Sequence, residues 1–186
     1  MANDLTDAKP AVAGRALPAL GLRPANANDE EFLLGLFIST RADEFRLINL
    51  ETKQKAALIA MQFKAQSGQF FTSYPQALNS IVLWNGDPIG RILIDRGETG
   101  FSLVDIALLP EHRNRGIGTA LLKDLIAEAT NDAKPIRLHV VSSNSAKRLY
   151  ERLGFCQVGE DAAYVEMRWV PRAAQILTER DDTPGL

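Results

Sequence analysis

The hexapeptide Arg113-Asn114-Arg115-Gly116-Ile117-Gly118 has a composition suited to binding a pyrophosphate. It follows the apolar run from Phe101 to Leu109 and precedes a segment of helical periodicity, which predicts a strand, a loop and a helix N-terminus. The first N–H groups of a helix lack intrahelical acceptors, and the helix dipole adds positive charge there. Glycines let the backbone approach phosphate oxygens, and arginines supply charge and paired donors. The alternative is a glycine-rich turn that opens a helix without binding a ligand.

The segment after this loop predicts a helix, a strand and a second helix. The first helix extends to about Asn131 because apolar residues recur at helical spacing, namely Ile117, Leu121, Leu122, Leu125, Ile126 and Ala129. Residues from Ile136 to Val141 have the pattern of a buried strand. Asn144 is a suitable N-cap for the second helix, and Gly154 is placed to end it.

Two motifs in this part of the chain resemble those of the GNAT N-acetyltransferase superfamily. Arg113-x-x-Gly116-x-Gly118 resembles the family's acetyl-CoA pyrophosphate loop, and Ile106-Ala107-Leu108-Leu109-Pro110 resembles the strand that leads into it. Asn144-x-Ala146-x-x-Leu149-Tyr150-x-x-Leu153-Gly154-Phe155 resembles its second signature. The motifs occur in the family's order with a helix and a strand between them. The resemblance is clear from Ser80 to Trp169 and weaker from Leu20 to about Tyr74.

The resemblance implies that acetyl-CoA is the co-substrate and that its pantetheine arm lies where two neighbouring strands splay apart. The residues expected to bind it are Ile106, Ala107, Leu108, Arg113, Asn114, Arg115, Gly116, Ile117, Gly118, Thr119, Asn144, Lys147 and Tyr150. The backbone N–H of Leu108 is the group expected to polarise the thioester carbonyl. A solvated surface lysine is the alternative for Lys147, and capping its own helix is a compatible second role for Asn144.

Acetyl transfer to an amine needs a neutral nucleophile, stabilisation of an oxyanion and a proton for the departing thiolate. Tyr150 occupies the position where the resembled family often carries the proton donor, and the alternative is a core aromatic residue. Asp105 interrupts an apolar strand, where a carboxylate needs a partner or a cleft, so it is the candidate base, directly or through water. The alternative for Asp105 is a structural bond to the backbone or to an arginine such as Arg91. Some family members carry a Glu further upstream on this strand, a region that here holds Ser102 and Leu103.

The remaining reactive side chains are assigned structural roles. His112 is predicted to be an exposed loop residue, with cofactor contact as the alternative. His139 is predicted to be a satisfied structural histidine, with a proton relay as the alternative. Cys156 is expected to be buried and unreactive. No cluster has metal-ligand spacing, so no metal is expected.

Composition limits the classes of partner. The chain has 186 residues, 46% of them hydrophobic and 24% charged, with a formal charge of −2, which is typical of one globular domain. Neither a basic block nor an apolar run long enough to span a bilayer occurs, so no nucleic acid or membrane partner is expected. The single cysteine and the absence of a signal-like N-terminus favour a cytoplasmic protein. A monomer and a homodimer both remain possible.

The rest of the chain predicts the elements that position the motifs. Residues 1–18 are expected to be a flexible extension, 19–170 a single GNAT-like domain and 171–186 a flexible tail. The predicted elements are a strand over Leu20–Pro24, a helix capped by Asn28-Asp29, a helix over Glu51–Gln66 ended by Ser67-Gly68, hairpin strands over Ser80–Trp84 and Ile89–Asp95 joined at Asn85-Gly86, and closing strands over Cys156–Val158 and Ala163–Trp169. Phe70, Phe71 and Tyr74 are interpreted as core aromatics, with the walls of an acceptor pocket as the alternative.

These elements predict an α/β fold with a mixed, mostly antiparallel central sheet and helices on both faces, the GNAT-like acyl-CoA N-acyltransferase fold. The expected function is transfer of an acetyl group from acetyl-CoA directly to a primary amine of a small molecule or peptide. The alternative is a non-catalytic acyl-CoA-binding or sensor module. Nucleotide-binding P-loop and Rossmann folds are disfavoured because their full glycine motifs are missing.

Overall fold

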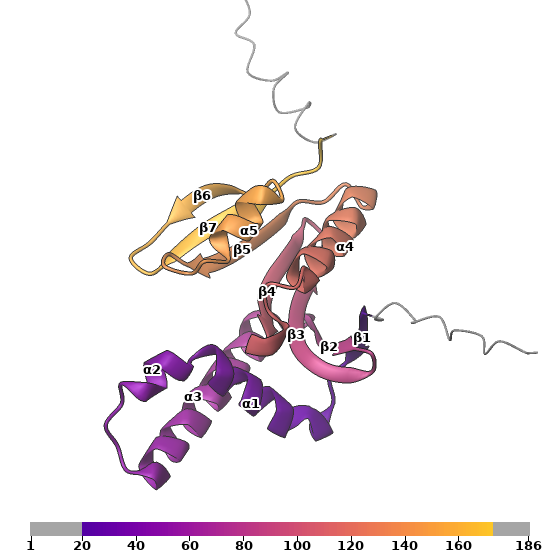
Figure 1. The fold of residues 1–186 in the computed structure, drawn as a ribbon. Helices are drawn as coiled ribbons and strands as arrows, with labels where there is room; N and C mark the ends of the chain where they lie inside the picture. Colours follow the sequence, from indigo (N-terminus) through magenta and orange to yellow (C-terminus); the bar gives the residue numbers. More distant parts are fainter. Residues whose placement is uncertain (1–19, 173–186) are drawn as a thin grey trace, which may run out of the picture.

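The computed structural model describes residues 20–172 as a mixed seven-stranded sheet with helices on both faces (Figure 1). The strands are β1 (Leu20–Pro24), β2 (Leu78–Trp84), β3 (Asp87–Arg96), β4 (Phe101–Leu108), β5 (Ile136–Val141), β6 (Cys156–Glu160) and β7 (Tyr164–Trp169). Their order across the sheet is β1-β2-β3-β4-β5-β7-β6, and only the β4–β5 pair is parallel. The predicted fold class is confirmed. The predicted N-terminal extension lies outside the described residues, as does the C-terminal tail beyond Arg172.

Five α-helices and two short 3₁₀ helices connect and cover these strands. They are η1 (Ala27–Asp29), α1 (Glu30–Thr40), α2 (Ala42–Arg46), α3 (Thr52–Ser73), η2 (Pro110–His112), α4 (Ile117–Asn131) and α5 (Lys147–Arg152). Helices α1, α2 and α3 gather on one side of the sheet, and α4 and α5 lie on the other (Figure 1). Among residues 20–172, no helix combines the length and apolar character that crossing a bilayer requires.

The two helical layers enclose separate hydrophobic cores. The larger core joins α4 and α5 to the sheet through residues such as Leu122, Leu125, Ile92, Ile136 and Met167. The smaller core lies within the α1–α3 layer, where the ring of Phe37 contacts those of Phe45 and Phe63 at centroid distances of 6.0 and 5.6 Å. The α1–α3 layer therefore has packing of its own in addition to its contact with β3 and β4.

Several turn signals in the sequence act as predicted. Asn85 and Gly86 have φ of 54° and 93°, the left-handed conformation that a tight hairpin between β2 and β3 requires. Gly154 has φ of 90° and follows α5, where the N–H of Phe155 donates to the Tyr150 carbonyl at 3.1 Å. The helix and strand predicted over Ile117–Asn131 and Ile136–Val141 are confirmed as α4 and β5.

The N-terminal half departs from prediction at three places. Gly68 does not end a helix, because α3 continues to Ser73; a glycine within a helix costs only about 1 kcal/mol, which packing offsets. Helix α2 was not predicted, since its five residues are too few to show a period. Asp29 is the N-cap residue of α1 but makes no side-chain cap bond. The capping box belongs to η1, where the side chain of Asn26 accepts from the N–H of Asn28 and Asp29 accepts from the N–H of Asn26.

Candidate active site

The strands β4 and β5 separate after three paired positions and leave a cavity between them. Their register pairs are Phe101 with Ile136, Ser102 with Arg137, and Leu103 with Leu138. Beyond these pairs, β5 follows β7 away from β4 (Figure 1). A cavity of about 600 Å³ opens at the separation and is lined by residues of β4, β5, α1, α3 and α5. We call it the transfer cavity and define it by Asp105, Ile106, Ala107, His139, Val140 and Tyr150.

Tyr150 lines the transfer cavity from the α4–α5 side. Its ring packs against Phe155 at a centroid distance of 5.8 Å, and only 6% of the residue is exposed. Burial, followed by the nearby charge of Asp105, raises the pKa of the Tyr150 hydroxyl to about 12. Among the described residues, this hydroxyl has no hydrogen-bond partner. Tyr150 is therefore part of the larger core and, at the same time, a protonated donor that faces the cavity.

Asp105 lines the same cavity and is paired with Arg91 of the neighbouring strand. The Nε and Nη2 atoms of Arg91 donate to Oδ2 of Asp105 at 3.0 and 2.6 Å. The guanidinium of Arg91 also lies over the ring of Phe70, 5.6 Å from its centroid, and Arg91 is only 9% exposed. Within residues 20–172, Oδ1 of Asp105 accepts no hydrogen bond. The ion pair envisaged in the sequence is therefore present, and one carboxylate oxygen remains available to a ligand.

The glycine-containing loop leads directly into α4 in the geometry expected of an anion site. Asn114 and Gly116 both have positive φ, 58° and 81°, and Gly116 is the N-cap of α4. No backbone carbonyl among the described residues accepts from the N–H groups of Asn114 or Arg115, and the first N–H groups of α4 are unpaired as at any helix start. Arg113 instead turns back, and its Nε donates to the Leu108 carbonyl at 2.8 Å. The loop thus offers consecutive main-chain donors.

The second motif lies next to this loop. A Cβ built on Gly118 would lie 3.6 Å from Leu149, so α4 and α5 begin side by side. Helix α5 starts at Lys147, later than expected, and Oδ1 of Asn144 accepts from the N–H of Ala146 at 2.9 Å in the turn before it. Asn144 also lines the transfer cavity. Nζ of Lys147 donates to Gln157 on β6 at 3.0 Å.

Four side chains occupy places that differ from their prediction. His139 is exposed, and it lines the transfer cavity together with its neighbours on β5. His112 is half-buried, and its Nδ1 has no partner among the described residues. Cys156 is exposed on β6, at the edge of the sheet. Phe71 is 76% exposed on α3 and is not a core residue.

The α1–α3 layer contributes cavity walls, and for Phe70 and Tyr74 this is the alternative interpretation given from the sequence rather than the core role preferred there. Phe70 and Tyr74 line the transfer cavity because α3 extends past Gly68. Leu33 and Arg41 line it from α1 and the residue that follows α1. Complementary charges at Arg91 and Asp105, within two apolar runs, were the one signal in the sequence for this wall. Among residues 20–172, no group of three or more His, Cys, Asp or Glu could hold a metal ion.

Comparison with known proteins agrees with this architecture. Residues 50–173 match the family model described as the acetyltransferase (GNAT) domain. The [ribosomal protein bS18]-alanine N-acetyltransferase of Haemophilus influenzae is 31% identical over 109 residues, which cover 58% of this chain and 73% of that protein. The separated strands, the loop before α4 and this match together define an acyltransferase of the acetyl-CoA-dependent kind. The chain belongs to the GNAT family and is an N-acetyltransferase.

Solved structures share the fold at lower sequence identity. The PaiA N-acetyltransferase from Thermoplasma acidophilum, in complex with coenzyme A, superposes with a TM-score of 0.62 at 18% identity, covering 82% of this chain and 99% of that one. The ribosomal-protein-S18-alanine N-acetyltransferase from Escherichia coli gives a TM-score of 0.54 at 21% identity, covering 82% and 94%. The GNAT-like fold predicted from the motifs is confirmed.

Proposed function

We propose that this protein transfers an acetyl group from acetyl-CoA directly to a primary amine of a small molecule or peptide. The observation that carries the proposal is that Tyr150 and Asp105 line one cavity at the separation of β4 and β5, beside the loop that leads into α4. An amine that enters from the α1–α3 side and a thioester that enters along β4 would meet there. A peptide acceptor is included because the relative from Haemophilus influenzae is named for an alanine of a ribosomal protein.

The co-substrate would be held mainly by main-chain groups. The unpaired N–H groups from Asn114 to Thr119 suit the pyrophosphate, with Arg115 adding charge. The β4 residues Ile106, Ala107 and Leu108 would receive the pantetheine arm, and Asn144 would contact it from the turn before α5. Lys147 would reach a phosphate after leaving Gln157.

Leu108 is suited to stabilise the tetrahedral oxyanion. The N–H of Leu109 donates to Ile89 of β3 at 2.9 Å. Successive N–H groups of a strand point to opposite edges, so the N–H of Leu108 points toward the edge that β5 has left. A donor fixed in that direction would gain most when negative charge develops on the thioester oxygen.

The two side chains would handle the protons. The amine nitrogen attacks the thioester carbonyl carbon, the C–S bond breaks, and the departing thiolate takes the hydroxyl proton of Tyr150. With a pKa of about 12, that hydroxyl is protonated throughout the neutral range. The free Oδ1 of Asp105 would accept the proton that the ammonium or the attacking amine loses, directly or through water. Arg91 would hold the carboxylate in place.

The test is incubation of the full chain with acetyl-CoA and a panel of primary amines, with free thiol and acetylated product measured together. Equal amounts of thiol and N-acetylated product are expected for at least one amine. A non-catalytic acyl-CoA sensor is the competing function, and it predicts acetyl-CoA binding by calorimetry with no amine-dependent thiol release. Acetyl-CoA binding without amine-dependent thiol release, for small amines and peptides alike, would reject the proposed activity.

A further inference from the structure

A second cavity lies beside the transfer cavity on the same face of the sheet. It has a volume of about 470 Å³ and lies between η1, α3 and the strands β2 and β3. We call it the distal cavity and define it by Asn26, Phe63, Ser67, Ala77, Asn79 and Leu93, none of which lines the transfer cavity. The two cavities share Leu33, Phe70, Tyr74 and Arg91, so they meet at one wall.

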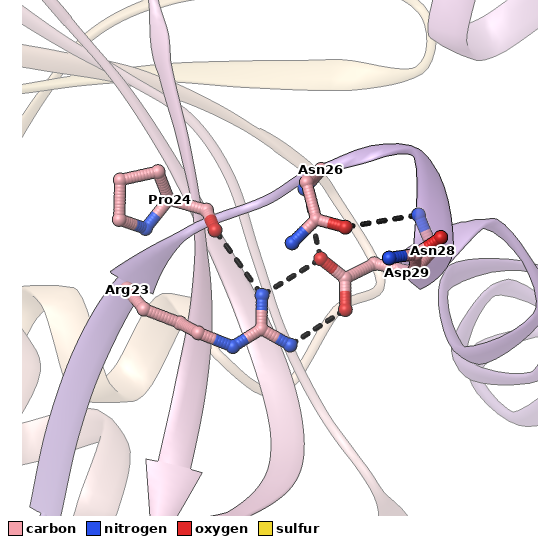
Figure 2. Close-up of polar contacts among 5 residues, drawn as sticks. All are labelled: Arg23, Pro24, Asn26, Asn28 and Asp29. Carbon is pink, nitrogen blue, oxygen red and sulfur yellow. Dashed lines mark hydrogen bonds and ion pairs between the residues drawn. The ribbon is translucent and has the colours of Figure 1, made fainter.

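The outer wall of the distal cavity is held by a hydrogen-bonded corner (Figure 2). Arg23 of β1 donates to both carboxylate oxygens of Asp29, at 2.8 and 2.6 Å. Asp29 accepts in turn from the N–H of Asn26 at 2.8 Å. These bonds fix Asn26 and Ala27, which line the cavity, relative to the edge of the sheet. These hydrogen bonds therefore hold in place the turn that bounds the cavity.

The distal cavity combines apolar walls with one unsatisfied amide, and polar residues such as Glu30, Lys64 and Ser67 also line it. Phe63, Phe70 and Leu93 supply apolar walls. Oδ1 of Asn79 is buried and has no hydrogen-bond partner among the described residues. The backbone carbonyl of Asn79 already accepts from Ala25, so the side chain is not needed to hold the strand. A buried acceptor without a donor is destabilising, and a ligand N–H that donates to it would remove that cost.

Arg91, in the wall that the two cavities share, offers a hydrogen-bond donor that complements the acceptor of Asn79. Two nitrogens of Arg91 donate to Asp105, and within residues 20–172 its Nη1 has no acceptor. Asn79, Leu93 and Asp105 are register partners on three adjacent strands, so Asn79 lies about 10 Å from Asp105 across the sheet. One extended residue of about 3.6 Å, with a hydrogen bond of about 2.9 Å at each end, spans roughly that distance. A group bound at Asp105 by its amine can therefore present its next amide to Arg91 and Asn79.

We propose, on the basis of the proposed function, that the distal cavity binds the part of the acceptor beyond its amine, and that this part is an amide next to an apolar side chain. The amide carbonyl accepts from Nη1 of Arg91, the amide N–H donates to Oδ1 of Asn79, and the apolar group fills the space among Phe63, Phe70 and Leu93. The preferred acceptors are then short peptides or amino-acid amides with an apolar residue after the amine.

The first experiment compares two acceptors, glycyl-leucinamide and glycyl-glycinamide, with the full chain and acetyl-CoA. The expected KM is at least tenfold lower for the leucine acceptor. Ser67→Leu on α3 fills the distal cavity and is expected to remove that difference by raising the KM for glycyl-leucinamide at least tenfold. Ala65→Leu, on the same helix but lining neither cavity, is the matched control and keeps the difference. Equal KM values for both acceptors with the unaltered chain would overturn the proposal.

Asn79→Leu separates the amide contact from packing. It removes an unsatisfied acceptor, so its melting temperature does not fall, but it lowers the preference for glycyl-leucinamide over 3-methylbutylamine, which lacks the amide. A preference that survives the substitution would overturn the role of Asn79. If no amine is acetylated, the proposed function fails, but the cavity can still be tested. Calorimetry would then measure the binding of N-acetyl-glycyl-leucinamide to the protein in the presence of coenzyme A. Binding that is lost in Ser67→Leu and kept in Ala65→Leu supports the distal cavity, whereas equal binding in both variants or no binding rejects it.

Discussion

The two ends of the candidate site use different parts of the polypeptide. At the end near α4, the loop from Arg113 to Gly116 is exposed and offers main-chain N–H groups in a conformation set by Asn114 and Gly116. At the acceptor end, buried or half-buried side chains form an ion pair, an aromatic contact and an unsatisfied amide. Main-chain donors suit a constant ligand, whereas side chains can change by single substitutions. We therefore propose that the first end binds the co-substrate and that the second selects the acceptor.

The largest expected effect on activity, at a site that separates catalysis from co-substrate binding, is at Tyr150. Tyr150→Phe removes the hydroxyl and keeps the packing against Phe155, so kcat is expected to fall about a hundredfold, while the affinity for acetyl-CoA by calorimetry changes less than twofold. Tyr164→Phe, which also removes a hydroxyl from the cavity wall, is the control and keeps its activity. An unchanged kcat under conditions where chemistry limits the rate would make Tyr150 only a core residue.

Asp105 tests whether the acceptor end also moves a proton. In Asp105→Asn, kcat/KM is expected to fall tenfold or more, and the pH–rate profile should change its shape because the carboxylate proposed as the base is gone. The measurement is a full pH–rate profile for both proteins. A purely structural Asp105 gives the opposite pattern: stability drops by about 1–3 kcal/mol on loss of the Arg91 pair, and the profile keeps its shape.

Gly116 and Gly86 both have positive φ, so substituting each one separates loss of ligand binding from backbone strain. Gly116→Ala and Gly86→Ala each place a side chain at positive φ, which costs about 1–2 kcal/mol of stability in both variants. Only Gly116→Ala is expected to weaken acetyl-CoA binding, by about tenfold or 1.4 kcal/mol, because only its loop faces the pyrophosphate. Calorimetry and thermal melting measure both quantities. Equal acetyl-CoA affinity in the two variants would remove the loop from the site.

The smallest expected effect concerns stability in acid. Hydrogen bonds from Arg23, then from the N–H of Asn26, lower the pKa of Asp29 to about 2 from 3.8. A lowered carboxylate pKa contributes stability above about pH 4 that is lost as the pH falls toward 2. The melting temperature should therefore drop over that interval, and the drop should be shallower in Asp29→Asn, with Asp124→Asn on α4 as control. Identical slopes in the two variants would show that this corner does not couple to folding.

The sequence predicted those parts of the fold whose signals are local. A glycine after a helix and an Asn-Gly between two strands act through their own φ values, and both Gly154 and Asn85-Gly86 adopt the expected conformations. The helix α4 was predicted to its last residue because its apolar face repeats over fifteen residues. These features need no knowledge of what packs against them.

The acceptor end was less predictable because its geometry depends on distant partners. Helix α3 passes through Gly68 since its contacts with α1 and the sheet outweigh the local signal, and this brings Phe70 and Tyr74 to the cavities. His139 was predicted to be a satisfied structural histidine, but it is exposed on β5 and lines the transfer cavity, where β5 diverges from β4. Neither outcome can be derived from spacing along one segment.

The amino-acid sequence by itself determined the family and indicated the candidate pyrophosphate loop and proton donor, because these lie in short motifs whose physics is that of a helix start or a strand end. Tertiary structure alone decided that Asp105 pairs with Arg91 and that Asn79 lies unsatisfied in a second cavity. The reason is that packing between segments far apart in the chain sets both the strand register across β2, β3 and β4 and the position of α3 against the sheet.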